Sequence, residues 1–211
     1  TRQAVVKLFE QGCHLIIIGC NTASAKALRS IQQRDLPTLD AKRRVLGIIR
    51  PTAESIGSLT STRHVGILAT EGTIKSDSYR LEIQKLFPDI AVQGMACPLW
   101  AAIVEANEAD SAGADYFVKK HIEQLMQTDP DIDTIVLGCT HYPFVQKMIR
   151  EIMGPHARLF DGALGIARQT ERRLAAEHLL SDRKAPGTII WQNSSADARL
   201  IALGKKLLAI K

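Results

Sequence analysis

Two of the four cysteines lie in equivalent sequence contexts and could share one proton-transfer reaction. Cys20 lies in the stretch Leu-Ile-Ile-Ile-Gly-Cys-Asn at residues 15–21, and Cys139 lies in Thr-Ile-Val-Leu-Gly-Cys-Thr at residues 134–140. The offset that superimposes the two cysteines also superimposes the glycines and apolar residues before them. Two thiols on opposite sides of one substrate could remove a proton from one face and deliver another to the opposite face.

Each cysteine is predicted to lie where a buried strand ends and a helix begins. Backbone N–H groups and the helix dipole at such a site favour a thiolate and also favour a bound carboxylate. Asn21, Thr22 and Thr140 add side chains that could cap the helices or hold an anionic ligand. A single cysteine after an apolar strand is usually a small buried hydrophobe, but two equivalent copies favour a functional role.

His141 follows Cys139 by two residues and could accept or return the proton of that thiol. A Cys-x-His pair alone is weak support for zinc, and no second Cys/His cluster has metal-ligand spacing, so we expect no metal. The five other histidines are expected to be structural: His14, His64, His121, His156 and His178.

The segment at residues 69–76, Ala-Thr-Glu-Gly-Thr-Ile-Lys-Ser, is predicted to follow a buried strand and to open a helix. Gly72 permits a tight turn there, and the hydroxyl groups around it could hold a carboxylate or phosphate or simply cap the turn. The sequence contains neither the GxxxxGK[ST] nor the GxGxxG pattern of nucleotide-binding loops.

The apolar periodicity predicts strands and helices that alternate along the chain. The predicted strands are 15–18, 45–49, 65–69, 90–96, 134–138, 157–160 and 188–191. The predicted helices are 1–11, one from about Thr22, 76–87, 99–106, 113–127, one opened by Pro143, 163–180 and 195–209. This order indicates an α/β fold with a mostly parallel sheet and helices on both faces.

The internal repeat further predicts two pseudo-symmetric three-layer α/β domains with an active site in the cleft between them. The first domain would comprise residues 1–49 and 161–211, and the second residues 50–160. The chain would cross near Arg50-Pro51 and return near Asp161-Gly162.

Composition places the chain among ordinary globular proteins, with 45% hydrophobic and 23% charged residues in 211. No apolar run is long enough to span a membrane and no signal peptide is recognisable, so we expect a cytoplasmic protein with free thiols. The net charge of +5 comes from scattered basic residues without interleaved aromatics, which argues against nucleic acid. The opening at Thr1 within a helical pattern suggests that an N-terminal portion is absent.

Three long motifs closely resemble those of the aspartate/glutamate racemase family. They are GCNTASA at residues 19–25, GILATEGTIKS at 66–76 and LGCTHYP at 137–143. The resemblance implies cofactor-independent racemisation of L-glutamate to D-glutamate. D-glutamate would be used for peptidoglycan biosynthesis, and thus for cell-wall biogenesis and cell shape. It also implies a small-molecule substrate and a homodimer.

The resemblance assigns acid/base roles to Cys20 and Cys139, one acting as thiolate while the other is a thiol. Asn21, Thr22, Thr140 and His141 would line the substrate site, and His141 would tune Cys139. Thr70 and Thr73 are further neighbours that the resemblance makes plausible.

The sequence departs from the family pattern at several places. The Asp-Ser-Gly motif and the Tyr-Gly loop have no counterpart, Leu99-Trp100-Ala101-Ala102 replaces an aromatic and proline pattern, and Gly162 replaces a common serine. Two alternatives therefore stay open: an aspartate racemase or another related member, and a protein that binds a dicarboxylate without turnover. Pure binding has no need for cysteine at both positions.

Overall fold

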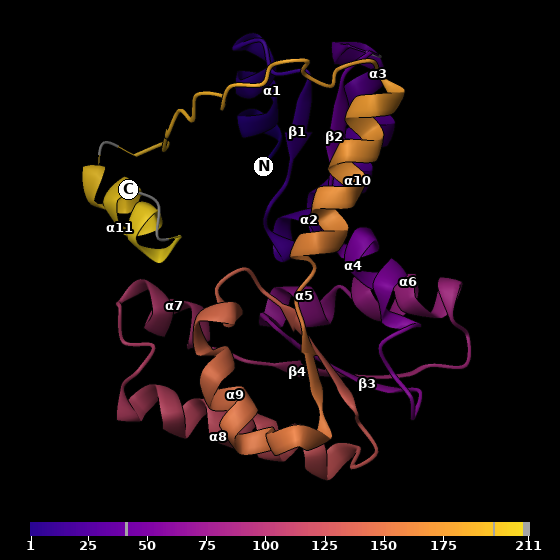
Figure 1. The fold of residues 1–211 in the computed structure, drawn as a ribbon, viewed down its shortest axis with the longest axis vertical. Helices are drawn as coiled ribbons and strands as arrows, with labels where there is room; N and C mark the ends of the chain where they lie inside the picture. The colour runs from indigo at the N-terminus through magenta and orange to yellow at the C-terminus, as the bar shows by residue number, and fades with distance from the viewer. Residues whose placement is uncertain (41, 196, 209–211) are drawn as a thin grey trace. The chain divides into compact units, whose positions relative to one another are not determined.

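The computed structural model describes residues 1–40, 42–195 and 197–208 (Figure 1). The chain divides into two compact units, Thr1–His178 and Leu179–Lys211. The first unit carries every strand of the described residues, and the second carries one helix, α11 (Ala198–Leu207). Among the described residues, no helix is both long and apolar enough to cross a membrane.

Sheet A consists of two parallel strands, β1 (Leu15–Ile17) and β2 (Arg44–Leu46), paired with Ile16 opposite Val45. The helices beside it are α1 (Arg2–Glu10) and α2 (Asn21–Ser30), the latter continuing through a π-helical turn (Ile31–Asp35) into α3 (Leu36–Leu39). Burial of apolar side chains from both helices against the strands forms one core. This core comprises Val5, Phe9, Ile16, Ile18, Ile31, Leu36 and Val45.

Sheet B has four parallel strands in the order β4-β3-β5-β6. The strands are β3 (His64–Ala69), β4 (Ala91–Ala96), β5 (Thr134–Gly138) and β6 (Arg158–Phe160). Ala69 pairs with both Ala96 and Gly138, so the carboxyl ends of the three longest strands meet at one edge. β3 and β5 lie inside the sheet and are buried on both faces, which explains their unbroken apolar runs.

Helices cover both faces of sheet B, with α5 and α6 on one side and α8 and α9 on the other (Figure 1). The helices of this part are α4 (Ile49–Ile56), α5 (Glu71–Lys75), α6 (Ser78–Leu86), α7 (Trp100–Glu105), α8 (Ala112–Thr128), α9 (Gln146–Met153) and α10 (Ala163–Ala176), with short 3-10 turns at Tyr142–Val145 and Gly154–His156. The expected α/β fold with parallel sheets is thereby confirmed.

Several expected elements differ from the structure. The predicted strand at 188–191 is wrong: these residues form no strand, and Ile189 and Ile190 are exposed. Their apolar run has no neighbouring strand to pair with. The predicted helix 163–180 ends at Ala176, before His178 takes a positive φ of 55°. Of the predicted helix 195–209, residues 196 and 209 lie outside the described residues.

The sequence predicts no helix at α4 or α5, and the helix expected from about Thr22 continues through residues 31–39. At α4, the sequence predicts only a crossing point between domains near Arg50-Pro51. Pro51 lies in the first turn of α4, where a helix has no need of its missing N–H group.

Candidate active site

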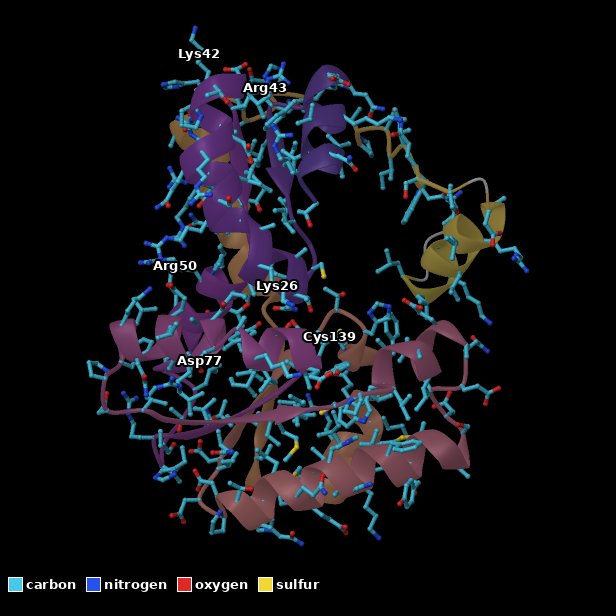
Figure 2. All side chains as sticks on the ribbon, turned by 180° about the vertical axis from the view of Figure 1, so that it is seen from behind. Lys26, Lys42, Arg43, Arg50, Asp77 and Cys139 are labelled. Atoms are coloured by element: carbon cyan, nitrogen blue, oxygen red, sulfur yellow. The ribbon has the colours of Figure 1, made fainter. Side chains whose placement is uncertain are left out.

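Cys20 and Cys139 occupy the turns that follow β1 and β5. Cys20 is exposed and forms the N-cap of α2 in an extended conformation, and its carbonyl accepts a hydrogen bond from Ser24 N at 2.8 Å. Cys139 is 8% exposed, and its carbonyl accepts from Tyr142 N at 3.0 Å. Tyr79 links the two turns, because its hydroxyl lies 2.7 Å from Asn21 Oδ1 and its Cε2 would lie 3.2 Å from a Cβ added to Gly138. Figure 2 labels Cys139 among the side chains.

A short chain of polar groups begins at Cys139. The Cys139 Sγ lies 3.8 Å from His141 Nδ1, and His141 Nε2 lies 3.0 Å from Glu105 Oε1 at the end of α7. The carboxylate therefore holds the imidazole from its far side, which fixes the ring and its tautomer. Glu105 was missed by the sequence analysis, because no motif or spacing distinguishes it from the other acidic residues.

Burial raises the pKa of the Cys139 thiol, and the charge of Glu105, or of Cys20 whenever it is a thiolate, raises it further. A hydrogen bond from the His141 backbone N–H acts in the opposite direction. The net effect is a raised pKa, which keeps this sulfur protonated at neutral pH. A protonated Cys139 is suited to donate a proton to a carbanion.

Three hydroxyl groups meet between α2 and α5. Thr22 Oγ1 lies 2.7 Å from Thr70 Oγ1 and 3.0 Å from Thr73 Oγ1, and the latter two are 3.1 Å apart. A Cβ on Gly72 would lie 3.0 Å from Thr22 Cγ2, so glycine lets the two helices approach this closely. Lys26 Nζ would lie 3.6 Å from the same added Cβ, and Figure 2 labels Lys26. The structure thus brings Thr70 and Thr73 beside Thr22, one residue from Asn21.

The remaining predicted site residues lie directly beside the cysteines. Asn21 is buried at 6% exposure and accepts a hydrogen bond at Oδ1 from the Tyr79 hydroxyl at 2.7 Å. Thr140 is exposed immediately after Cys139. The predicted polar residues are therefore close in sequence to their cysteines, and Tyr79 is a further neighbour that the sequence analysis did not single out.

A buried aromatic cluster packs next to the turn at Cys139. The Trp100 and Tyr142 rings lie 4.8 Å apart, and the Tyr142 hydroxyl donates to the Cys97 carbonyl at 2.9 Å. Trp100 Nε1 donates to His121 Nδ1 at 3.0 Å, and burial lowers the pKa of His121, which favours the neutral ring that can accept this bond. The Leu99-Trp100 departure from the family pattern therefore supplies the centre of this packing.

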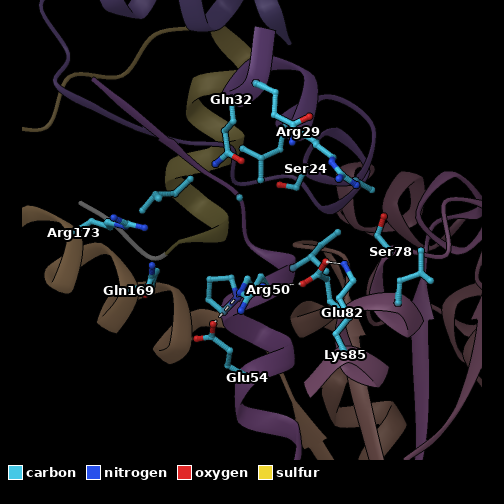
Figure 3. Close-up of a pocket in the computed structure, with 18 residues that line it drawn as sticks. Ser24, Arg29, Gln32, Arg50, Glu54, Ser78, Glu82, Lys85, Gln169 and Arg173 are labelled. Atoms are coloured by element: carbon cyan, nitrogen blue, oxygen red, sulfur yellow. Dashed lines mark hydrogen bonds and ion pairs between the residues drawn. The ribbon is translucent and has the colours of Figure 1, made fainter. Parts of the chain in front are cut away.

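A separate cavity of about 540 Å³ lies against another face of α2 and contains neither cysteine (Figure 3). Charged groups of α4 and α6 line it, and Arg50 forms ion pairs there with Glu54 and Glu82 at 3.2 and 3.5 Å. This cavity carries no group placed for proton transfer at the cysteines, so the turns after β1 and β5 are the candidate active site.

One group of possible metal ligands occurs among the described residues, and it excludes both cysteines. His64, Asp129 and Asp131 have ligand atoms within 4.8 Å of one another. His64 Nδ1 lies 2.8 Å from Asp129 Oδ2, and this contact raises the pKa of His64. His64 and His121 both have side-chain partners, which the sequence alone did not reveal.

Comparison with known proteins defines the class to which this fold and site belong. Residues 2–170 match the family model described as Asp/Glu/Hydantoin racemase, and the chain belongs to this family. A glutamate racemase of Geobacter metallireducens is 33% identical over 204 residues, which are 97% of this chain and 73% of that protein. A glutamate racemase of Streptococcus agalactiae is 39% identical over 162 residues, 76% of this chain and 58% of that protein.

Solved structures of glutamate racemases share the fold. The enzyme of Francisella tularensis, crystallised in complex with D-glutamate, matches with a TM-score of 0.81 at 27% identity, covering 98% of this chain and 74% of that chain. An isoform from Bacillus anthracis matches with a TM-score of 0.75 at 30% identity, covering 84% and 64%. The chain thus spans between about three fifths and three quarters of these relatives.

Proposed function

We propose that this protein is a glutamate racemase that interconverts L- and D-glutamate without a cofactor. The observation that carries the proposal is the pair of thiols at equivalent strand ends, whose two turns are joined by Tyr79 through a hydrogen bond to Asn21 and contact with Gly138. The family membership and the glutamate racemases among its relatives support glutamate as the substrate.

The proposed reaction uses two bases. A thiolate at one cysteine removes the α-proton of glutamate, which leaves a carbanion, and the thiol of the other cysteine delivers a proton to the opposite face. The first cysteine ends as thiol and the second as thiolate, so the reverse reaction runs with the roles exchanged. Buried hydrogen-bond donors near the α-carboxylate would stabilise the negative charge that develops there.

Each neighbouring side chain has a part in this proposal. Asn21, Thr22 and Thr140 would bind the substrate, and His141 would bind it and also exchange a proton with Cys139. Glu105 would act through His141 as a positioning residue, since its carboxylate lies 3.0 Å from the far ring nitrogen. The Thr22, Thr70 and Thr73 hydroxyls would lie beside the bound carboxylate.

The biological setting belongs to the same proposal. The enzyme would act in the cytoplasm as a homodimer. The D-glutamate that it makes would be used for peptidoglycan biosynthesis. A strain that lacks the gene should require added D-glutamate for growth; normal growth without it would contradict this role.

The division into two domains, with the second at residues 50–160, stays a prediction.

Substitution of either cysteine tests the mechanism directly. In the protein purified from its complete gene, Cys20→Ser and Cys139→Ser should each lower kcat at least about a hundredfold, because a hydroxyl is a far weaker acid than a thiol and does not ionise to a base near neutral pH. Circular dichroism with both enantiomers of glutamate and of aspartate measures turnover and distinguishes the related substrates. Cys13→Ser, which changes a half-buried thiol against the core of sheet A, is the matched control.

Exchange of the α-proton with deuterium from solvent provides a second readout. Turnover in D₂O should place deuterium at Cα of the product enantiomer. Full racemisation by either serine variant would contradict the two-base mechanism. Tight binding of glutamate without any turnover or exchange in the unaltered protein would instead support the alternative of a dicarboxylate-binding protein.

A further inference from the structure

Tyr79 contacts both cysteine-bearing turns at once. This residue lies in the first turn of α6 and is 5% exposed. Its hydroxyl donates to Asn21 Oδ1, directly after Cys20, at a distance of 2.7 Å. Its ring lies against Gly138, directly before Cys139, where an added Cβ would come within 3.2 Å of Tyr79 Cε2. One side chain therefore joins the two equivalent turns.

The hydrogen bond fixes which end of the Asn21 amide faces the site. Burial raises the pKa of the Tyr79 phenol, so it stays protonated and donates its hydrogen to the carbonyl oxygen of Asn21. The amide nitrogen of Asn21 forms no hydrogen bond with the described residues. Every fully buried side-chain nitrogen or oxygen among these residues has a partner, so this unpartnered nitrogen is not fully buried.

A free amide nitrogen is chemically suited to one class of ligand. Its two N–H groups donate hydrogen bonds and accept none, so they complement a carboxylate. With the amide rotated by half a turn, the carbonyl oxygen would face the carboxylate and repel it. The orientation of Asn21 therefore affects binding, and an intramolecular partner that fixes it lowers the ordering cost of binding.

We propose that Tyr79 is a positioning residue of the racemase, which holds the Asn21 carbonyl oxygen and packs against Gly138 so that the Asn21 N–H groups face the substrate carboxylate. This proposal rests on the proposed function for the identity of the substrate. The geometry of Tyr79, Asn21 and Gly138 requires no assumption about which cysteine acts first.

The variant Tyr79→Phe removes the hydroxyl and keeps the ring against Gly138. It should raise KM for both enantiomers of glutamate about three- to tenfold, the loss expected for one hydrogen bond, and change kcat by less than about twofold. Thr134→Val is the matched control, because it removes a buried hydroxyl from the opposite end of β5. Even if this substitution lowers the stability of the control, its KM should equal that of the unaltered protein.

A double-mutant cycle distinguishes orientation from a general structural effect. Asn21→Ala should itself raise KM, and adding Tyr79→Phe to Asn21→Ala should raise it no further, because the group that Tyr79 orients is gone. Additive effects of the two substitutions, an unchanged KM in Tyr79→Phe, or an equal rise in Thr134→Val would each overturn the proposal.

Binding of D-glutamate, measured by calorimetry, separates this proposal from the proposed function. If the unaltered protein binds D-glutamate without racemising it, the proposed activity fails. The weaker binding expected for Tyr79→Phe then still tests the role of Tyr79. If the unaltered protein does not bind D-glutamate at all, both proposals are overturned.

Discussion

At the residue scale, the candidate site combines side chains that follow the two cysteines with side chains from other helices. Asn21, Thr22, Thr140 and His141 follow their cysteines by one or two residues, and the structure places them at the same turns. Glu105 and Tyr79 lie on other helices, and only folding brings them to the site. No periodicity or local motif encodes such long-range contacts, so sequence reasoning could not find them.

Glu105→Gln tests whether the carboxylate positions His141. The variant keeps a side chain of the same size but removes the charge that holds the ring, so kcat should fall about tenfold with little change in KM. Since the charge of Glu105 contributes to the raised pKa of Cys139, the pH dependence attributable to this thiol should shift to lower pH. Rates measured from pH 6 to 10 give both results.

The control for this substitution is Glu108→Gln, which neutralises another exposed carboxylate in the loop after α7. It should keep the kcat and the pH profile of the unaltered protein. Equal kcat values and profiles for all three proteins would show that Glu105 has no part in the reaction.

At the element scale, the strands that lie inside a sheet were the most predictable. β3 and β5 appear as apolar runs because both of their faces are buried, and the same reasoning failed at 188–191, where an apolar run has no strand beside it. Gly162 illustrates a tertiary effect on a single position: a side chain there would clash with Thr52 of α4. Such a contact explains the departure from serine but leaves no signal in the local sequence.

The loop before β5 depends on Asp133. Burial raises the pKa of its carboxyl group, but hydrogen bonds from the Thr60 and Thr134 side chains and from the Ser61 and Thr62 backbone outweigh burial and hold the pKa at about 2. Because this pKa is below the ordinary value of 3.8, the carboxylate stabilises the fold above about pH 4 and loses this effect as the pH falls toward 2.

Asp133→Asn should therefore lower the free energy of unfolding at pH 7 by about 1–3 kcal/mol, since the backbone N–H groups of the loop lose a charged acceptor. Its stability should also fall less steeply between pH 4 and 2 than that of the unaltered protein. Urea unfolding across this pH range measures both effects. The exposed neighbour Asp131 provides the control, for which Asp131→Asn should change stability by less than about 0.5 kcal/mol.

At the scale of the whole first unit, two helices carry the chain between the sheets. α4 leads from β2 toward sheet B, and α10 follows β6 and packs against α4. The two helices approach closely at Gly165, where an added Cβ would lie 2.6 Å from the Pro51 carbonyl oxygen. Backbone cannot move aside as a flexible side chain can, so this contact fixes the spacing of the two helices.

Gly165→Ala should force α10 away from α4 and lower the free energy of unfolding by about 1–3 kcal/mol, the usual effect of overpacking. Thermal unfolding should show a Tm lower by several degrees, because about 1 kcal/mol corresponds to about 2–4 °C in a chain of this size.

Gly113→Ala makes the same change in the first turn of α8, where only Ser111 Oγ lies nearby, at 3.6 Å. There alanine should stabilise the protein by up to about 1 kcal/mol through its better helix propensity. Effects of equal sign and size at the two positions would mean that the contact between α4 and α10 does not constrain the fold.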